Sequence, residues 1–192
     1  MGRPREFEAE YAVAKAMEIF WANGYAETSP QQLADGVGIG KGSLYHAFGS
    51  KHELFMRCLE RYVGMTDGEL TAVMDEPTPI RVRIRKLLTG FIDADLAGPE
   101  RSGCFVINTT VEMGSDDPLV ADIVRRSIER TETVLTTSFI AAQHDGDIAA
   151  SQDPRALAKL VQSTMIGLRI LAKTAGDRAH LQPIVEAVVQ AL

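Results

Sequence analysis

The sequence predicts an all-α protein of about nine helices, with a small N-terminal unit of three helices followed by a larger helical unit. Apolar residues recur at helical spacing through most of the 192 residues. No segment alternates convincingly between apolar and polar residues, and the nearest exception, Cys104–Val111, also fits a buried helix. Capping and helix-breaking residues separate the periodic segments. A chain of this length with 45% hydrophobic residues can bury one or two cores.

The first helix is expected over residues 7–23. Its apolar residues, which include Phe20 and Trp21, stand at helical spacing. The pair Asn23-Gly24 is typical of a helix C-terminus, because glycine adopts the left-handed conformation that ends many helices.

A short second helix is expected from Pro30 to Gly36. Ser29 is typical of an N-cap, and proline suits the first helical position because its missing N–H has no partner there in any case. Gln32 stands three residues after the cap, and the pair forms a capping box in which each side chain bonds the other residue's backbone N–H.

A glycine-rich turn, GVGIG at residues 36–40, leads into a third short helix over residues 41–48. A second capping box is expected between Ser50 and Glu53. It opens a long fourth helix that continues to about Met74.

Five more helices are expected in the rest of the chain. Prolines, glycines and acidic caps bound them at about residues 80–96, 104–113, 116–140, 154–175 and 181–192. We therefore expect an N-terminal domain of residues 1–50 and a second helical domain of residues 51–192.

The charge balance excludes indiscriminate binding to polyanions. The net charge is −6, and the first 62 residues contain one more acidic than basic residue. Any site for nucleic acid must therefore depend on where individual charges are placed rather than on bulk attraction.

The chain is expected in the cytoplasm, without a membrane partner. No apolar run approaches the ~20 residues of a membrane span, and the N-terminus lacks the apolar segment of a secretory signal. The two cysteines, Cys58 and Cys104, lie far apart in the chain, and a structural disulfide is not expected in a reducing compartment.

The glycines beside Lys41 raise the question of a phosphate-binding loop. Such a loop needs a preceding strand and the spacing G-x-x-x-x-G-K-[ST], whereas here Gly42 follows the lysine and a helix precedes the turn. Short helix, glycine turn and short helix is instead the helix-turn-helix arrangement, whose second helix enters the major groove of DNA.

The third helix has the side chains for this role. Leu44 and Phe48 can anchor it to the core, and Tyr45 can reach a phosphate or a thymine methyl group. The residues expected to contact DNA are polar or small and lie on this helix or at neighbouring helix starts: Thr28, Ser29, Lys41, Gly42, Ser43, Tyr45, His46 and Lys51. For Tyr45 and His46 the alternative is an ordinary solvated helix surface.

The segment GYAETSPQQLADGVGIGKGSLYHAFGSKHELF, with the helices before and after it, resembles the TetR family of transcriptional regulators. The resemblance covers about the first 60 residues and implies a three-helix DNA-binding domain, a larger ligand-binding domain, and a homodimer on a palindromic operator. It places the same residues of the third helix on the operator, with Thr28 and Lys51 on phosphates. Ala47 and Gly49 depart from the family pattern.

The last two helices each carry an apolar stripe. The first stripe is Leu157, Leu160, Val161, Thr164, Met165 and Leu168, and the second is Leu181, Ile184, Val185, Val188, Val189 and Leu192. The resemblance implies dimerisation through the last two helices, which favours a four-helix interface across a two-fold axis. The alternative is that both stripes only cover the core of their own domain.

An effector site is expected around the segment RSGCFVINTTVEMG. On a helix, Cys104, Asn108 and Glu112 would share one face and could orient a mostly apolar ligand. The predicted effector-binding residues add three apolar walls to this set: Phe91, Cys104, Asn108, Glu112, Phe139 and Met165. Alternatively, Asn108 and Glu112 hydrogen-bond neighbouring helices.

Cys104 is also a redox candidate. It stands at the start of a helix, where unpaired amides stabilise a thiolate. Together with Lys173, it resembles the cysteine through which some family members sense oxidants or electrophiles. The alternative is a small buried hydrophobic residue, which is also what we expect of Cys58.

No catalytic or metal site is expected. The four histidines lack metal-ligand spacing, and there is neither H-E-x-x-H nor C-x-x-C, so we expect no enzyme, metal or cofactor. The predicted function is a ligand-responsive repressor, with an oxidant sensor acting through Cys104 or an activator as alternatives.

Overall fold

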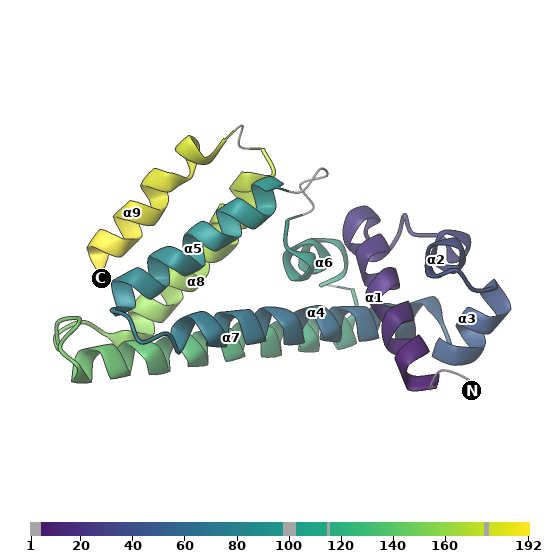
Figure 1. The fold of residues 1–192 in the computed structure, drawn as a ribbon, viewed down its shortest axis with the longest axis horizontal. Coiled ribbons are helices and arrows are strands. Elements are labelled where there is room, and N and C mark those ends of the chain that lie inside the picture. The colour runs from purple at the N-terminus through teal and green to yellow at the C-terminus, as the bar shows by residue number, and fades with distance from the viewer. Residues whose placement is uncertain (1–4, 98–102, 115, 175–176) are drawn as a thin grey trace. The chain divides into compact units, whose positions relative to one another are not determined.

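The computed structural model describes residues 5–97, 103–114, 116–174 and 177–192, with side chains from residue 9 onward. Every regular element in these ranges is helical, which confirms the all-α prediction. The nine α-helices of these ranges (Figure 1) are α1 (Arg5–Asn23), α2 (Pro30–Val37), α3 (Lys41–Phe48), α4 (Lys51–Met74), α5 (Ile80–Ala97), α6 (Phe105–Met113), α7 (Pro118–His144), α8 (Pro154–Ala172) and α9 (Gln182–Ala191). A short 3-10 helix at Arg178–His180 was not expected from the sequence.

The chain forms two compact units that differ from a simple division along the sequence. Unit 1 contains the residues up to Met65 together with Phe105–Val124, and unit 2 contains Thr66–Cys104 and Arg125–Leu192. Both α4 and α7 therefore contribute to both units. The predicted division into domains 1–50 and 51–192 stays a prediction.

Unit 1 has an aromatic core around Phe55 of α4. The ring centroids of Phe20 and Tyr25 each lie 5.0 Å from that of Phe55. From α6, Phe105 packs edge-on against Phe55 at 5.5 Å and against Tyr62 at 5.7 Å. Edge-to-face contacts at these distances are favourable, and they make α6 part of the aromatic core of unit 1.

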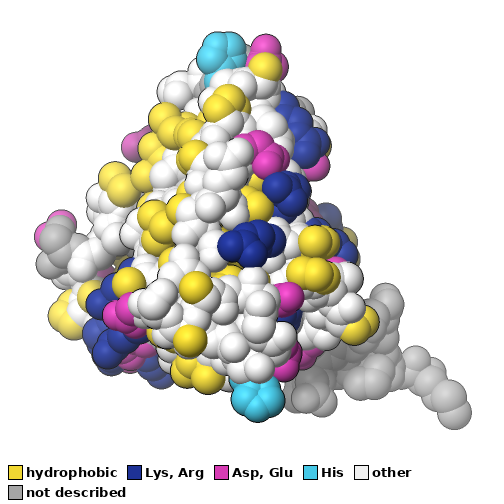
Figure 2. Space-filling view, turned by 90° about the vertical axis from the view of Figure 1, so that its left-hand side faces the viewer, with side chains coloured by type: hydrophobic (Ala, Val, Ile, Leu, Met, Phe, Trp, Pro, Cys, Tyr) yellow, Lys and Arg dark blue, Asp and Glu magenta, His cyan; other side chains and the backbone are white. Residues whose placement is uncertain are grey.

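Unit 2 is built around α5, α8 and α9, which pack on one another. Its core includes most members of the two apolar stripes, among them Leu157, Val161, Leu168, Leu181, Val185, Val188, Val189 and Leu192. The stripes therefore contribute largely to the core of their own unit, and the four-helix dimer interface through these helices stays a prediction. Figure 2 shows one face of the molecule, on which hydrophobic side chains lie on both flanks and at the base, with Lys, Arg, Asp and Glu between them.

Two further properties concern membranes and metals. In the described ranges, no helix combines the length and the apolar character that crossing a membrane requires. Among the same residues, no three His, Cys, Asp or Glu side chains are grouped so that they could hold a metal ion.

Candidate nucleic-acid interface

The start of α2 is fixed by the capping box that the sequence predicts. Ser29 Oγ accepts a hydrogen bond from Gln32 N at 3.2 Å, and Gln32 Oε1 accepts one from Ser29 N at 2.7 Å. Pro30 occupies the first turn, and the helix ends at Gly38, whose φ of 77° permits its N–H to bond Ala34 O and Asp35 O. This geometry turns the chain sharply into α3.

Helix α3 presents a polar face on two buried anchors. Leu44 is fully buried and Phe48 is 4% exposed, while Lys41, Gly42, Ser43 and His46 are exposed. This alternation holds the helix against unit 1 while its outer face is free for a ligand. It is the arrangement in which a recognition helix lies in a major groove.

Two residues of α3 have properties suited to close contact with DNA. Burial raises the pKa of Tyr45, which is half-buried, so its phenol stays neutral at pH 7 and can donate a hydrogen bond to a phosphate. A Cβ atom added to Gly42 would meet no atom within 4 Å, so the protein itself does not require glycine there. An open glycine on the outer face lets a backbone approach closely.

The start of α4 lies beside this face. Ser50 Oγ accepts a hydrogen bond from Glu53 N at 3.0 Å, which is one half of the second predicted capping box. Lys51 is half-buried, and its ammonium nitrogen lies 4.4 Å from the centroid of the Tyr25 ring. Lys51 is thus held next to α3 by a tyrosine that sequence reasoning did not single out.

Thr28 takes an interior position. Its side chain is fully buried, and its hydroxyl donates to Gly24 O at 2.6 Å. In this conformation the hydroxyl stabilises the turn between α1 and α2 and is turned away from solvent. Ser29, by contrast, is half-buried.

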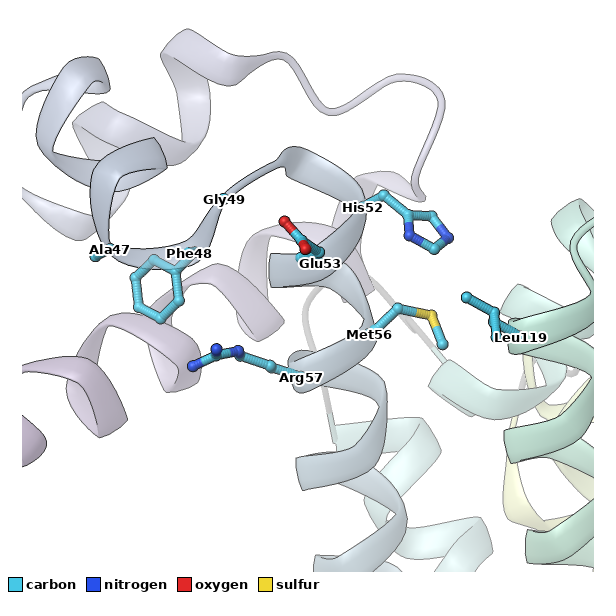
Figure 3. Close-up of a pocket in the computed structure, with 8 residues that line it drawn as sticks. All are labelled: Ala47, Phe48, Gly49, His52, Glu53, Met56, Arg57 and Leu119. Atoms are coloured by element: carbon cyan, nitrogen blue, oxygen red, sulfur yellow. The ribbon is translucent and has the colours of Figure 1, made fainter.

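A shallow hollow lies behind α3, within unit 1. It is lined by the end of α3, the first turns of α4 and the start of α7: Ala47, Phe48, Gly49, His52, Glu53, Met56, Arg57 and Leu119 (Figure 3). Arg57 points toward the Phe48 ring, with its guanidinium carbon 5.5 Å from the ring centroid. None of the six residues predicted for effector binding lines this hollow.

The six predicted effector residues are divided between the two units. Asn108 and Glu112 belong to unit 1, while Cys104 and the three apolar residues belong to unit 2. Phe139 is fully buried in the core of unit 2, and Phe91 and Met165 are partly buried against that core. Their role in effector binding stays a prediction.

Glu112 has a defined set of partners. Its Oε2 accepts a hydrogen bond from Tyr25 N at 2.9 Å, and its Oε1 accepts one from Ala26 N at 2.6 Å. These contacts correspond to the alternative in which Glu112 bonds a neighbouring element. Sequence spacing could not identify the partner, because residues 25 and 112 are brought together only by the fold.

Cys104 is half-buried next to Gly103, which adopts a φ of 67°. A Cβ atom on Gly103 would lie 2.6 Å from Lys173 Cε, so the lysine side chain packs directly over this glycine. The structure therefore brings Lys173 next to the residue that precedes Cys104, and the redox role of this pair stays a prediction. Cys58 is fully buried, and burial raises the pKa of its thiol to about 12.

Two family models match the chain. Residues 12–58 match the model described as bacterial regulatory proteins, tetR family, and residues 81–188 match the model of the tetracyclin repressor-like C-terminal domain. The chain belongs to the TetR family. This membership confirms the resemblance inferred from the glycine-rich segment.

Individual relatives match the chain over most or all of its length. It is 30% identical to the uncharacterized HTH-type transcriptional regulator YezE of Bacillus subtilis over 197 residues, covering 100% of both chains. It is 26% identical to the HTH-type transcriptional repressor ComR of Escherichia coli, covering 95% of this chain and 88% of ComR. A solved structure of a cysteine mutant of the TetR regulator CifR, complexed with 26-base-pair operator DNA, is 29% identical, covers 99% of both chains and has a TM-score of 0.83.

The protein is accordingly a DNA-binding transcriptional regulator with an N-terminal helix-turn-helix, and not an enzyme. The helix-turn-helix consists of α2 and α3. Its outward face and the residues around the start of α4 form the candidate interface with DNA.

Proposed function

We propose that this TetR-family protein is a repressor that binds a palindromic operator as a homodimer and releases it when an effector binds. The observation that supports this most directly is the outer face of α3, where Lys41, Ser43 and His46 are exposed above the buried Leu44 and Phe48. The related regulator CifR has been solved with its operator. Acting on chromosomal DNA, the protein would work in the cytoplasm.

We assign distinct tasks to the residues of this face. Lys41, Ser43 and His46 would contact base edges or neighbouring phosphates. Tyr45 would donate a hydrogen bond from its phenol to a phosphate. Ser29 and Lys51 would contact flanking phosphates at the starts of α2 and α4, where helix N-termini attract anions. Sequence selectivity would come from the base contacts, while the phosphate contacts set register.

A homodimer is supported by the exposed side of α8. Apolar side chains that would otherwise be left in water lie there: Leu160, Ile166, Ile170 and Leu171. Leu160 belongs to the apolar stripe of α8 and the other three do not, and all four lie outside the core of unit 2. Burying them against a second copy would place two reading helices on one duplex, about one helical turn apart.

Release of DNA by an effector depends on thermodynamic linkage between effector binding and DNA binding. An effector can release DNA only if it binds one arrangement of the reading heads more tightly than the other. We place the effector near Phe91 and Met165 of unit 2, which are partly buried apolar side chains suited to a small organic ligand. Repression follows from occupancy of a promoter, and activation would follow if the bound dimer recruits polymerase instead.

The test begins with selection of bound duplexes from a random pool, followed by measurement of affinity for the selected operator across salt concentrations. The doubly substituted Lys41→Ala, Tyr45→Ala protein should lose most of its affinity, and its dependence on salt should flatten. The matched control is Lys15→Ala with Tyr11→Ala, the same residue types on α1, where Lys15 is paired with Glu18. Equal losses in the two proteins would refute the assignment of α3 as the reading helix.

A second candidate function, oxidant sensing through Cys104, is favoured by the packing of Lys173 over Gly103. A nearby ammonium group stabilises a thiolate and so speeds its reaction with electrophiles. Treatment with peroxide or an electrophile should release the operator from the unsubstituted protein but not from Cys104→Ser. Release that persists in the variant would eliminate this mechanism.

A further inference from the structure

We propose that Tyr25 is a positioning residue for operator binding: its ring holds the ammonium group of Lys51 beside the DNA backbone, and Glu112 of α6 holds Tyr25 in place. This inference rests on the proposed contact between Lys51 and an operator phosphate. It adds two residues, from the α1–α2 turn and from α6, to the machinery of DNA binding.

The contact between Lys51 and Tyr25 has the geometry of a cation–π interaction. The ammonium nitrogen lies 4.4 Å from the ring centroid, well within the ~6 Å over which such pairs attract. Lysine otherwise has a flexible four-carbon stem whose freedom is lost when it binds a phosphate. A lysine already held over a ring loses less of that freedom on binding, so the phosphate contact becomes stronger.

The Tyr25 ring is itself held firmly. It lies edge-on to Phe55 with centroids 5.0 Å apart, and it stacks on Phe20 at 6.2 Å. Burial, with smaller contributions from Asp117 and Tyr45, raises the pKa of Tyr25. The phenol therefore stays neutral at physiological pH, and the ring presents the same face to Lys51 throughout.

Glu112 fixes the backbone that carries this ring. Its two carboxylate oxygens accept hydrogen bonds from the consecutive N–H groups of Tyr25 and Ala26, at 2.9 and 2.6 Å. Gly24, at a φ of 81°, precedes them, and a Cβ atom there would stand 2.9 Å from Glu112 Oε2. Glycine therefore serves both the turn and the close approach of the carboxylate.

Helix α6 brings Glu112 to the turn from a distant part of the sequence. Phe105, at the other end of the helix, packs on the same Phe55 ring that supports Tyr25. Two independent contacts thus join α6 to the residues around Tyr25. The hydrogen bonds that Glu112 accepts from two backbone N–H groups fix the backbone of Tyr25, and the contact between Phe105 and Phe55 supports its ring. Together they determine the position of the Lys51 ammonium group.

The first experiment is a double-mutant cycle on the affinity for the selected operator, measured between about 50 and 300 mM salt. Lys51→Gln should reduce the slope of log K against log salt by about 0.9, as expected for one lost phosphate contact. Tyr25→Leu should weaken binding about threefold to tenfold in the unsubstituted protein, but less than twofold in the Lys51→Gln background. Tyr25→Phe retains the ring and should bind as the unsubstituted protein does.

An equal loss from Tyr25→Leu in both backgrounds would overturn the inference, because Tyr25 would then act without Lys51. Failure of this inference about Tyr25 can be distinguished from failure of the proposed function. If the unsubstituted protein selects no duplex at all, the proposed function fails. If it binds with a Lys41-dependent affinity but Lys51→Gln leaves the slope unchanged, only the present inference fails.

The Glu112 part of the inference has its own comparison. Glu112→Gln should weaken operator binding in the same direction as Tyr25→Leu, and should likewise have little effect once Lys51 is replaced by glutamine. Glu60→Gln, an exposed glutamate of the same unit on α4, is the matched control and should leave affinity unchanged. A Glu112→Gln protein that binds with full affinity would overturn this step.

A spectroscopic measurement covers the case in which Tyr25→Leu does not fold. In protein labelled with carbon-13 lysine, the ε-methylene protons of Lys51 should be shifted upfield by the Tyr25 ring current, with the signal assigned by its disappearance in Lys51→Arg. Tyr25→Phe should retain this shift, and Glu112→Gln should reduce it. A Lys51 signal at the position of a solvated lysine in the unsubstituted protein would overturn the inference.

Discussion

Arg169 of α8 and Asp95 of α5 form a two-pronged ion pair inside unit 2. Arg169 Nε donates to Asp95 Oδ2 at 3.1 Å and Nη2 donates to Oδ1 at 2.9 Å, with the side chains only 10% and 5% exposed. The same guanidinium donates to Gly103 O at 3.3 Å and lies 4.9 Å from the centroid of the Phe91 ring. One buried cation thus joins two helices to the residue that precedes Cys104.

Breaking this pair is expected to destabilise the protein strongly. Arg169→Met removes the cation and leaves the Asp95 carboxylate buried without it, which costs about 3–5 kcal/mol. Urea unfolding followed by circular dichroism at pH 7 measures the loss. The double variant Asp95→Leu, Arg169→Met removes both charges and should be more stable than Arg169→Met alone. A double variant that is less stable than the single one would contradict this account.

The hydrogen-bond contact between His52 and Asp117 predicts a dependence of stability on pH. His52 Nε2 and Asp117 Oδ2 lie 2.6 Å apart. Burial alone would raise the pKa of Asp117, but the hydrogen bonds from His52 and from the N–H groups of Val120 and Leu119 outweigh it and lower that pKa. Because the folded state depresses the pKa, the resulting stability is present above the unfolded value of about 4 and is lost as pH falls through the folded value.

Asp117→Asn should therefore be less stable than the unsubstituted protein at pH 7, by about 0.5–1 kcal/mol, and the difference should shrink below about pH 4. Asp117→Ala should lose more, about 1–2 kcal/mol, because it also removes the cap at the start of α7. Free energies of unfolding at several pH values measure both. If the difference in free energy of unfolding between Asp117→Asn and the unsubstituted protein grows as the pH falls, the prediction is contradicted.

Gly42→Ala is expected to separate stability from DNA binding. An alanine methyl group meets no protein atom within 4 Å, and alanine is the better helix former, so stability should stay equal or rise by up to about 1 kcal/mol. Affinity for the operator should fall at least tenfold, because the methyl group enters the space between α3 and DNA. Gly90→Ala, at an equally open helical site on α5, is the control and should bind normally.

The two cysteines are expected to differ in reactivity. At pH 8 the native protein should react rapidly with a thiol reagent at one position, Cys104, because burial raises the pKa of Cys58 to about 12 and keeps it a thiol. Both should react after denaturation. Cys104→Ser should abolish the rapid phase of the reaction. If the rapid phase is lost in Cys58→Ser instead, Cys58 is the reactive cysteine and the prediction is wrong.

The positions of the helices could be predicted closely because the signals that start and stop helices are local. The Ser29–Gln32 capping box and Pro154 after its Asp153 cap mark starts within a few residues of where the structure has them. The predicted end of α7 at residue 140 was four residues short of His144, although Gly146 follows at a φ of 79° and its N–H bonds Gln143 O. The exact ends of helices are less readable from sequence than their existence.

Which side of each helix faces inward was less readable. In α1 the buried residues are Ala12, Val13, Ala16, Met17 and Phe20. Tyr11, which shares their helical spacing, is 55% exposed. The periodic pattern of α9 is equally compatible with a dimer and with a core, and only the tertiary structure shows that its apolar residues pack on α5 and α8. Periodicity identifies an apolar face but not what covers it.

By itself the sequence determined the helical class, the order of the helices and the helix-turn-helix, because periodicity, caps and turn glycines act between residues a few positions apart. The tertiary structure decided that α6 belongs with the DNA-binding helices, that Thr28 points inward and that Glu112 bonds the turn carrying Tyr25. These relationships join residues more than 80 positions apart or depend on burial. They arise only when the core closes, and no local pattern encodes them.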